Sequence, residues 1–352
     1  MSFSKTILQW YQVHKRELPW RNSPEPYTVW LSEIMLQQTR VAQGLPYFLK
    51  FVTKYPTVCD LAAAPEEEVL KLWQGLGYYS RARNLHYTAK TVCFELGGVF
   101  PNTYEGLKKL KGVGPYTAAA IGSICYNLPT PVVDGNVFRL LSRYFGVEIP
   151  INTSAGQAYF NQLAQEVMDK QQIGDYNQGI MEFGAVQCVP KSPDCLRCPL
   201  SESCWAFAHK KANVLPVKQG QQKIRIRHFH YIVPLDTALN TILVQRPDTG
   251  IWSKLYEFPL LELESETLPN VSQLDTYLRQ ILVRKDLSTL EIIRFNETPV
   301  IHKLSHQHLH TTFWLCKTNQ LPKGALSWQK AESLPVPVLI ANFMETLKIS
   351  YF

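Results

Sequence analysis

The sequence predicts two domains, an all-α domain followed by a smaller α+β domain. At 352 residues the chain is longer than one average hydrophobic core supports. From Ile7 to Cys204 the apolar residues follow a helical period, whereas short β-like runs begin only after residue 227. Hydrophobic residues make up 45% of the chain and charged residues 18%, a balance that excludes a disordered protein. No run of about 20 apolar residues predicts a membrane span.

Helical periodicity recurs through the first region, and glycine or proline separates the segments. In the segment 29–41, Leu31, Ile34 and Met35 share one stripe with Gln38. The other expected helices are 82–96, 117–126, 136–145, 155–169, 177–186 and one that begins near Val69 and is closed by Gly75-Leu76-Gly77.

Composition changes near residue 212. Residues 214–227 contain Pro, Gly, three Gln and four basic residues, which is typical of an exposed connector. The expected strands are 229–235, 241–246, 292–295 and 311–317, with a helix at 272–283. The predicted domains are therefore 1–212 and 228–352, joined by the connector 213–227.

Net charge and cysteine usage indicate the compartment and the kind of partner. The formal net charge of +7 suits a nucleic-acid partner but does not demand one. The N-terminus runs straight into an amphipathic segment without an apolar signal core, so we expect a cytoplasmic protein, in the bacterial cytosol or nucleoid. In that reducing compartment, Cys59, Cys93, Cys125 and Cys316 are expected to be small core residues among apolar neighbours.

The other four cysteines form the strongest motif of the chain. Cys188, Cys195, Cys198 and Cys204 have the spacing C-x6-C-x2-C-x5-C. Four thiolates this close in sequence suit one soft centre, either a [4Fe–4S] cluster or a structural zinc ion. Because a zinc ribbon usually pairs two matched C-x-x-C knuckles, the spacing favours the cluster.

A glycine-rich turn between two expected helices forms the second motif. In Leu110-Lys111-Gly112-Val113-Gly114-Pro115-Tyr116, the glycines Gly112 and Gly114 let the backbone turn tightly before the next helix. Such a turn presents N–H groups at a helix N-terminus, where a phosphate binds. Asp134 follows 20 residues after Gly114, directly before an expected helix, where aspartate is a common N-cap.

These motifs resemble those of the endonuclease III superfamily of helix–hairpin–helix DNA glycosylases. Four further segments, 18–21 (LPWR), 31–41, 75–81 and 181–185, are similar to the adenine DNA glycosylases of the MutY type. The resemblance covers nearly the whole of the first 210 residues, with the motifs in family order.

The resemblance implies a catalytic set. Glu33, which by itself would be an ordinary solvated residue, is implied as the acid that protonates adenine at N7. Asp134 is implied as the carboxylate that stabilises or captures the sugar cation, by the logic of retaining glycosidases. Tyr116 and Asn136 are implied as supports around the sugar. Glycosylases that also cut the strand carry a lysine where this chain has Tyr116, so we expect a monofunctional enzyme.

The same resemblance implies the residues that contact DNA. Trp20, Arg21 and Glu182 are expected near the adenine, which must leave the base stack to reach them. Gln38 and Tyr78 are expected to fill or wedge the duplex at the vacated position.

The second region is similar to the MutT-like (Nudix-like) domain of this family. Residues 260–280 lack the clustered glutamates that hold Mg²⁺, so we expect no pyrophosphatase activity. Ser305 and His306 match the loop with which the family reads 8-oxoguanine, although Leu304 replaces the usual phenylalanine. A metal site formed by His306, His308 and His310 is the alternative for this segment.

The sequence therefore predicts an enzyme that hydrolyses the N-glycosidic bond of adenine opposite 8-oxoguanine or guanine. We expect a [4Fe–4S] cofactor, double-stranded DNA as the partner, a monomer and no membrane association. One alternative is an endonuclease III-like glycosylase-lyase that acts on oxidised pyrimidines, against which Tyr116 argues. The other is a non-catalytic mismatch-binding protein, which would not need both Glu33 and Asp134.

Overall fold

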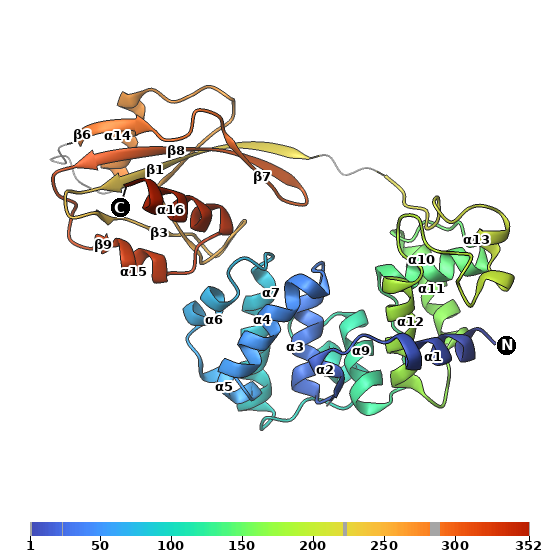
Figure 1. Cartoon of the computed structure of the whole chain (residues 1–352). Helices are drawn as coiled ribbons and strands as arrows, with labels where there is room; N and C mark the ends of the chain where they lie inside the picture. The colour runs from blue at the N-terminus through green and yellow to red at the C-terminus, as the bar shows by residue number, and fades with distance from the viewer. Residues whose placement is uncertain (1, 23, 221–223, 282–288, 352) are drawn as a thin grey trace. The chain divides into compact units, whose positions relative to one another are not determined.

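The computed structural model describes every residue except 1, 23, 221–223, 282–288 and 352 (Figure 1). The chain divides by its internal contacts into a helical unit and a C-terminal unit. The helical unit consists of Met1–Ala63 and Asn84–Gly220, and the C-terminal unit of Gln221–Phe352 together with the segment Ala64–Arg83.

The region from residue 2 to residue 220 is built from helices and loops, which confirms the all-α prediction. Its helices are α1 (Phe3–His14), α2 (Pro19–Asn22), α3 (Pro26–Leu36), α4 (Val41–Lys54), α5 (Val58–Ala63), α6 (Glu66–Leu72), α7 (Ser80–Lys90), the π-helical turn η1 (Thr91–Glu95), α8 (Tyr104–Lys108), α9 (Pro115–Tyr126), α10 (Gly135–Phe145), α11 (Ser154–Val167), α12 (Ile173–Val186), the 3₁₀ turn η2 (Ser201–Ser203) and α13 (Trp205–Ala208).

Several boundaries differ from the sequence prediction by one to four residues, and two of the expected helices are divided. The helix expected over 29–41 ends at Leu36, because Gln38 adopts a left-handed backbone conformation (φ 58°) and α4 begins only at Val41. The helix expected over 82–96 is α7 followed by the π-helical turn η1.

One hydrophobic core of the helical unit lies where α12 packs against α1, α9 and α10. Phe160, Ile180 and Phe183 are among its fully buried members. Burial of a side chain of this size contributes roughly 2–3 kcal/mol, so this core fixes the two helices, α9 and α10, that begin beside the candidate site.

The C-terminal unit is built on a five-stranded sheet, as an α+β domain requires. Its strand order is β5 (Leu260–Leu263), β1 (Arg225–Leu235), β8 (Gln307–Thr318), β6 (Thr289–Arg294), and β7 (Val300–Lys303) also pairs with β8. β1 and β8 are parallel, with Phe229 opposite Thr311, and the other pairs are antiparallel. Two small ribbons pair β2 (Asn240–Thr241) with β9 (Leu326–Ser327) and β3 (Val244–Gln245) with β4 (Tyr256–Glu257).

The sheet is covered by helices on both faces (Figure 1). Phe229, Tyr231 and Phe313 face a core completed by α15 (Trp328–Ser333) and α16 (Val338–Tyr351). Ile232 and Trp314 face the other way, against α14 (Val271–Ile281). The predicted helix at 272–283 corresponds to α14, with its last two residues outside the described part, whereas α15 and α16 were not predicted.

The end of the predicted connector belongs to the sheet. β1 begins at Arg225, and the Arg225 N–H donates to the carbonyl of His306 at 3.1 Å. Leu215 is buried, and the carbonyl of Val217 accepts a hydrogen bond from Ile151. Within the predicted connector, Leu215 and Val217 therefore have partners in the helical unit and residues 225–227 belong to β1, whereas Val214, Ile224 and Ile226 are exposed and residues 221–223 lie outside the described part.

The cysteine prediction also needs a correction. Cys59 in α5 and Cys93 in η1 form a disulfide, whereas both were expected to be free core thiols. The physical reason is that α5 packs against η1, which brings the two Cα atoms to 5.1 Å, within disulfide reach. Cys316 is a buried free thiol, as expected, and Cys125 is free and half-buried.

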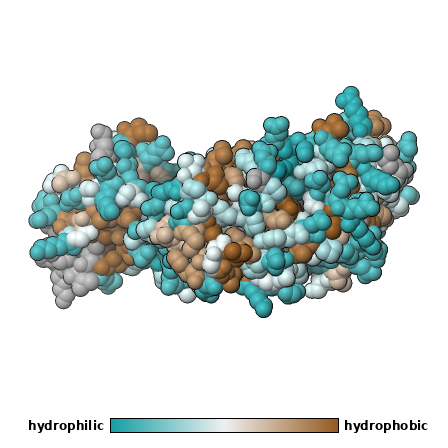
Figure 2. Space-filling view, turned by 90° about the horizontal axis from the view of Figure 1, so that it is seen from below, coloured by the Kyte–Doolittle hydropathy of each residue, from teal (hydrophilic) through white to brown (hydrophobic). Residues whose placement is uncertain are grey.

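No helix among the described residues is long and apolar enough to cross a bilayer. On the face shown in Figure 2, hydrophobic patches lie between hydrophilic areas. Exposed hydrophobic side chains of the helical unit include Phe94, Val99 and Leu196.

Candidate active site

Glu33 is the first of two carboxylates that the helical unit brings together. It lies in α3, where Ser32 and Ile34 on either side are buried, and its own side chain is partly buried. Burial raises the pKa of Glu33 to about 7; a hydrogen bond from Tyr116 opposes this rise, and the negative charge of Asp134 adds to it. A carboxyl with this pKa is partly protonated at neutral pH and can donate a proton.

Asp134 is the second carboxylate and is also the N-cap of α10. Its Oδ1 accepts hydrogen bonds from the backbone N–H of Asn136 (2.9 Å) and Val137 (2.8 Å), and its Oδ2 accepts from Nδ2 of Asn136 (2.7 Å). Burial raises the pKa of Asp134, while these hydrogen bonds and the charge of Arg139 oppose the rise. The N-cap interpretation of Asp134 is therefore confirmed, and its catalytic role stays a prediction.

Asn136 extends this network toward the cysteine loop. Its Oδ1 accepts a hydrogen bond from Arg139 at 2.8 Å, and Arg139 also donates to the carbonyls of Gly184 (2.6 Å) and Cys188 (2.8 Å). Continuous hydrogen bonds thus join Asp134 to the backbone of the first cysteine of the motif.

The negative charges of both Glu33 and Asp134 act on the hydroxyl of Tyr116. Tyr116 is the second residue of α9, its hydroxyl donates to Sδ of Met181 at 3.2 Å, and its pKa is raised by burial and by the charges of Glu33 and Asp134. The structure therefore brings Glu33, Tyr116, Asp134 and Asn136 together, as the sequence predicted.

Glu182 is held by two arginines, one of which the sequence analysis missed. Arg16 donates to both carboxylate oxygens at 2.6 Å, and Arg21 donates to Oε2 at 2.8 Å. Burial alone would raise the pKa of Glu182, but these hydrogen bonds lower it to about 2. Arg21 also lowers the pKa of Glu33, so Arg21 links this ion-pair cluster electrostatically to Glu33. The pair Arg16–Glu182 spans 166 residues, and no local pattern could have indicated it.

Two further residues of the predicted site, Trp20 and Gln38, lie in α2 and in the turn after α3. Trp20 is buried in α2, with its ring edge against Phe48 at 4.9 Å between centroids. Gln38 is exposed in the turn between α3 and α4. The structure shows no contact of either residue with Glu33 or Asp134 in the described part of the chain.

The glycine-rich turn forms a hairpin between α8 and α9. Gly112 has φ 81°, a conformation that favours glycine, and Gly114 caps α9 in an extended conformation. The first N–H groups of α9 lack intrahelical partners, as in every helix, so they are free to bind an anion.

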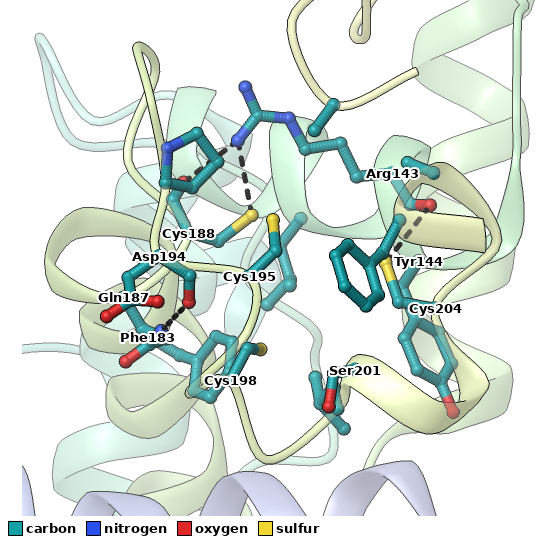
Figure 3. A pocket seen from close by; sticks show the side chains of 16 residues that line it. Arg143, Tyr144, Phe183, Gln187, Cys188, Asp194, Cys195, Cys198, Ser201 and Cys204 are labelled. Carbon is teal, nitrogen blue, oxygen red and sulfur yellow. Dashed lines mark hydrogen bonds between the residues drawn. The ribbon is translucent and has the colours of Figure 1, made fainter. Parts of the chain in front are cut away.

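The four cysteines of the motif line one pocket (Figure 3). Leu140, Phe183 and Phe207 supply apolar walls, and Arg143 donates to Sγ of Cys188 at 3.3 Å. Burial and the charges of the neighbouring cysteines raise the pKa of Cys198 to about 11. At neutral pH this shift favours the protonated thiol of Cys198, and a bound metal centre would reverse it.

Ser305 and His306 lie exposed in the bend between β7 and β8, within the C-terminal unit. The hydroxyl of Ser305 is hydrogen-bonded to that of Tyr78, which has a left-handed backbone conformation (φ 48°). The sequence analysis singled out both residues but did not pair them. Leu304 packs against the sheet core, so it has a structural contact of its own.

The metal alternative for the histidines gains no support. Within the described residues, no group of three or more His, Cys, Asp or Glu side chains is arranged to hold a metal ion. His308 and His310 do share one face of β8, while His306 precedes the strand.

Comparisons with known proteins agree with this architecture. The family model described as HhH-GPD superfamily base excision DNA repair protein matches residues 31–166, and the NUDIX domain model matches residues 231–346. An adenine DNA glycosylase of Buchnera aphidicola subsp. Baizongia pistaciae is 33% identical over 309 residues, which are 88% of this chain and 84% of that protein. The adenine DNA glycosylase of Mus musculus is 35% identical, over 94% of this chain and 74% of that protein.

A solved structure supports the fold of the first region. It is that of a thermostable thymine-DNA glycosylase, with a TM-score of 0.55 and 30% identity, covering 59% of this chain and 95% of that one. Because the matched relatives span most of the chain and the two domain models match in family order, the chain belongs to the adenine DNA glycosylase (MutY) family of the HhH-GPD superfamily, with a C-terminal NUDIX domain.

Proposed function

We propose that this adenine DNA glycosylase removes adenine opposite 8-oxoguanine or guanine by acid-assisted hydrolysis, and that it leaves an intact strand with an abasic site. The observation that carries the proposal is the different environment of two neighbouring carboxylates. Glu33 has a pKa of about 7, whereas three hydrogen bonds stabilise the ionised form of Asp134. Two carboxyl groups whose environments differ in this way suit the roles of acid and anion.

Glu33 is the proton donor in this proposal. Adenine leaves poorly as an anion, so its departure requires protonation of the base, at N7 by the family resemblance. A carboxyl that is about half protonated near neutral pH supplies that proton without a large energetic penalty. The Tyr116 hydroxyl acts on the same carboxyl and orients it.

Asp134 is the stabilising carboxylate. Loss of adenine leaves an oxocarbenium-like sugar, whose positive charge a nearby carboxylate stabilises or captures. Asn136 supports this role, because it donates to Asp134 while accepting from Arg139. Water then completes the hydrolysis, and since Tyr116 offers no amine, no Schiff base forms at that position.

The ion-pair cluster of Glu182, Arg16 and Arg21 is proposed as the rigid wall of the base pocket. Glu182 is only 1% exposed, and both of its oxygens are engaged by arginine. We therefore assign Glu182 to holding Arg21 in place, while Arg21 and Trp20 are the residues implied beside the flipped adenine.

The cysteine pocket is proposed to hold a [4Fe–4S] cluster. Cys188, Cys195, Cys198 and Cys204 line one pocket, and their spacing, which lacks two matched C-x-x-C pairs, favours a cluster over a single zinc ion. When bound, the cluster compensates the thiolate charges and orders the loop.

The C-terminal unit is proposed to recognise 8-oxoguanine through the exposed Ser305 and His306. The hydrogen bond between Tyr78 and Ser305 brings the implied wedge residue and the implied lesion-reading residue into contact within one unit. Two loops joined in this way would sense the lesion while the duplex is opened. Double-stranded DNA is the proposed partner, and the protein is proposed to act as a monomer.

A single assay tests the reaction. Labelled duplexes that contain adenine opposite 8-oxoguanine, adenine opposite guanine, or an oxidised pyrimidine are incubated with the protein, and half of each sample is then treated with alkali. We expect cleavage only of the adenine strands and only after alkali. Prompt scission that borohydride traps would support a lyase, and binding without any cleavage would support a mismatch-binding protein.

Iron and acid-labile sulfide analyses test the cofactor. We expect both elements, together with broad visible absorption, in the purified protein. Stoichiometric zinc without iron would contradict the cluster.

A further inference from the structure

The hairpin that precedes α9 is supported by one face of α7. Asn84, Tyr87 and Thr88 are spaced i, i+3 and i+4, so their side chains lie on the same side of that helix. All three contact Lys111 or Gly112, in the middle of the hairpin.

Two of these contacts fix the hairpin backbone. The buried hydroxyl of Thr88 donates to the carbonyl of Lys111 at 2.7 Å. Asn84 lies so close to Gly112 that a Cβ on this glycine would come within 2.8 Å of the Asn84 Cβ. The backbone of the hairpin is thus set by contacts that need no DNA.

The third contact involves a charge. The ammonium group of Lys111 lies over the ring of Tyr87, 4.3 Å from its centroid. Tyr87 is 54% exposed, and Lys111 is also exposed, so both groups are accessible from solvent. An ammonium group over an aromatic face is attracted by the ring quadrupole.

We propose that Tyr87 is a positioning residue for DNA binding, because its ring holds the ammonium group of Lys111, in the hairpin that leads into α9, in place to engage a DNA phosphate. This inference rests on the proposed function, in which double-stranded DNA is the partner. A free lysine side chain loses considerable rotamer entropy when it binds a phosphate, and the ring removes part of that loss in advance.

Equilibrium binding of a duplex with adenine opposite 8-oxoguanine tests the proposal. Affinity is measured by fluorescence anisotropy between about 50 and 200 mM KCl for the full-length protein and for Y87L, Y87F, K111A and the double variant Y87L/K111A. We expect Y87L to weaken binding about two- to fivefold, the range of an exposed cation–π contact. Y87F, which keeps the ring, should bind like the unmodified protein.

The salt dependence distinguishes positioning from a general structural effect. Loss of one phosphate contact lowers the slope of log K against log [salt] by up to about 0.9, and we expect that change in K111A and part of it in Y87L. In the K111A background, Y87L should have no further effect on affinity.

Tyr47, whose ring lies below Lys50 in α4, provides a matched control, because Y47L removes a similar pair away from the hairpin. We expect Y47L to leave the affinity and the salt slope unchanged. The inference fails if Y87F binds as weakly as Y87L, or if Y87L weakens binding equally with and without Lys111. Failure of the unmodified protein to bind the duplex would instead contradict the proposed function.

Discussion

The helical unit and the C-terminal unit each bury a glutamate, but they treat its charge differently. Glu33 of the helical unit makes no ion pair within the described chain, and its pKa rises to about 7. Glu257 of the C-terminal unit, only 8% exposed, accepts two hydrogen bonds from Arg246 at 2.6 and 2.7 Å and one from Tyr231 at 2.7 Å. Burial raises its pKa too, against those partners.

The comparison distinguishes Glu33, whose carboxyl can exchange a proton, from Glu257, whose carboxylate orders its neighbours. A buried carboxylate with a full set of partners orders its surroundings and keeps its charge. A carboxyl without an ion pair exchanges a proton near neutral pH, which an acid catalyst requires. Glu182, which is paired with two arginines in the helical unit, belongs with Glu257 in this respect.

The largest effect is expected for E33Q. Because glutamine cannot donate a carboxylic proton, adenine release should fall by about 10²- to 10⁴-fold, with duplex binding retained. In the unmodified protein the rate should decline as the pH rises through about 7, since the acid form is then lost. Single-turnover cleavage measures both effects. E25Q, at the exposed N-cap of the same helix, is the control and should cleave at the normal rate. Near-normal cleavage by E33Q would contradict the role of Glu33 as proton donor.

E257Q should lower the stability of the C-terminal unit without slowing adenine release. It leaves the Arg246 guanidinium buried without its counter-charge, which costs roughly 3 kcal/mol in the free energy of unfolding of the C-terminal unit. Urea denaturation measures this loss, while adenine release from a mispair with guanine at saturating protein should be unchanged. E262Q breaks the more exposed pair with Arg227 and should cost less than about 1 kcal/mol. Equal losses in the two variants would remove the distinction between buried and exposed pairs.

The lesion-reading loop should show a smaller, selective effect. Hydrogen bonds to base edges distinguish bases by roughly 1–3 kcal/mol each, so S305A/H306A should reduce the preference for 8-oxoguanine over guanine about tenfold. Because Ser305 also bonds to Tyr78, Y78F is the control that removes this contact alone. If Y78F accounts for the whole loss, Ser305 acts through Tyr78, and a double variant that still discriminates would place lesion recognition elsewhere.

The smallest effect is expected from His230 in the sheet. Burial, together with the charges of His228 and Arg294, lowers its pKa to about 4. The unfolded chain therefore binds a proton before the folded chain does, and stability should fall as the pH drops from about 6.5 toward 4. Between pH 7.5 and 5.5 we expect a loss on the order of 1 kcal/mol, and H230Q should flatten this dependence in denaturation curves. If the stability of H230Q depends on pH as strongly as that of the unmodified protein, groups other than His230 cause the pH dependence.

Local patterns predicted most of the helical unit but not its long-range pairs. The apolar spacing gave the ranges of α9, α10 and α12, and the N-cap preference of aspartate marked Asp134. The end of α3 before Gln38 was not predicted, because the apolar stripe continues on both sides of this residue. The ion pair of Arg16 with Glu182 depends on the tertiary fold alone.

In the C-terminal unit the sequence predicted β1, β6 and β8, whereas the expected strand 241–246 is divided into β2 and β3, and β4, β5, β7 and β9 were not predicted. β1 and β8 each carry long β-branched and aromatic runs, which favour strands. α16 was missed although its buried residues Leu339, Ile340, Phe343 and Leu347 follow a helical period, so this signal was present in the sequence. The pairing of Tyr78 with Ser305 spans 227 residues and could not be predicted.

The disulfide between Cys59 and Cys93 has a topological consequence. It closes a covalent ring over a sequence separation of 34, and the ring contains the segment Ala64–Arg83, which belongs to the C-terminal unit by its contacts. A ring of this size lowers the chain entropy of the unfolded state, which raises the free energy of unfolding by an amount on the order of 4 kcal/mol. A single proteolytic cut inside the ring would leave both fragments covalently joined until a reductant separates them. Oxidised protein nicked between the two cysteines should therefore migrate as one species without reductant and as two with it, so gel electrophoresis alone reports whether the ring is closed.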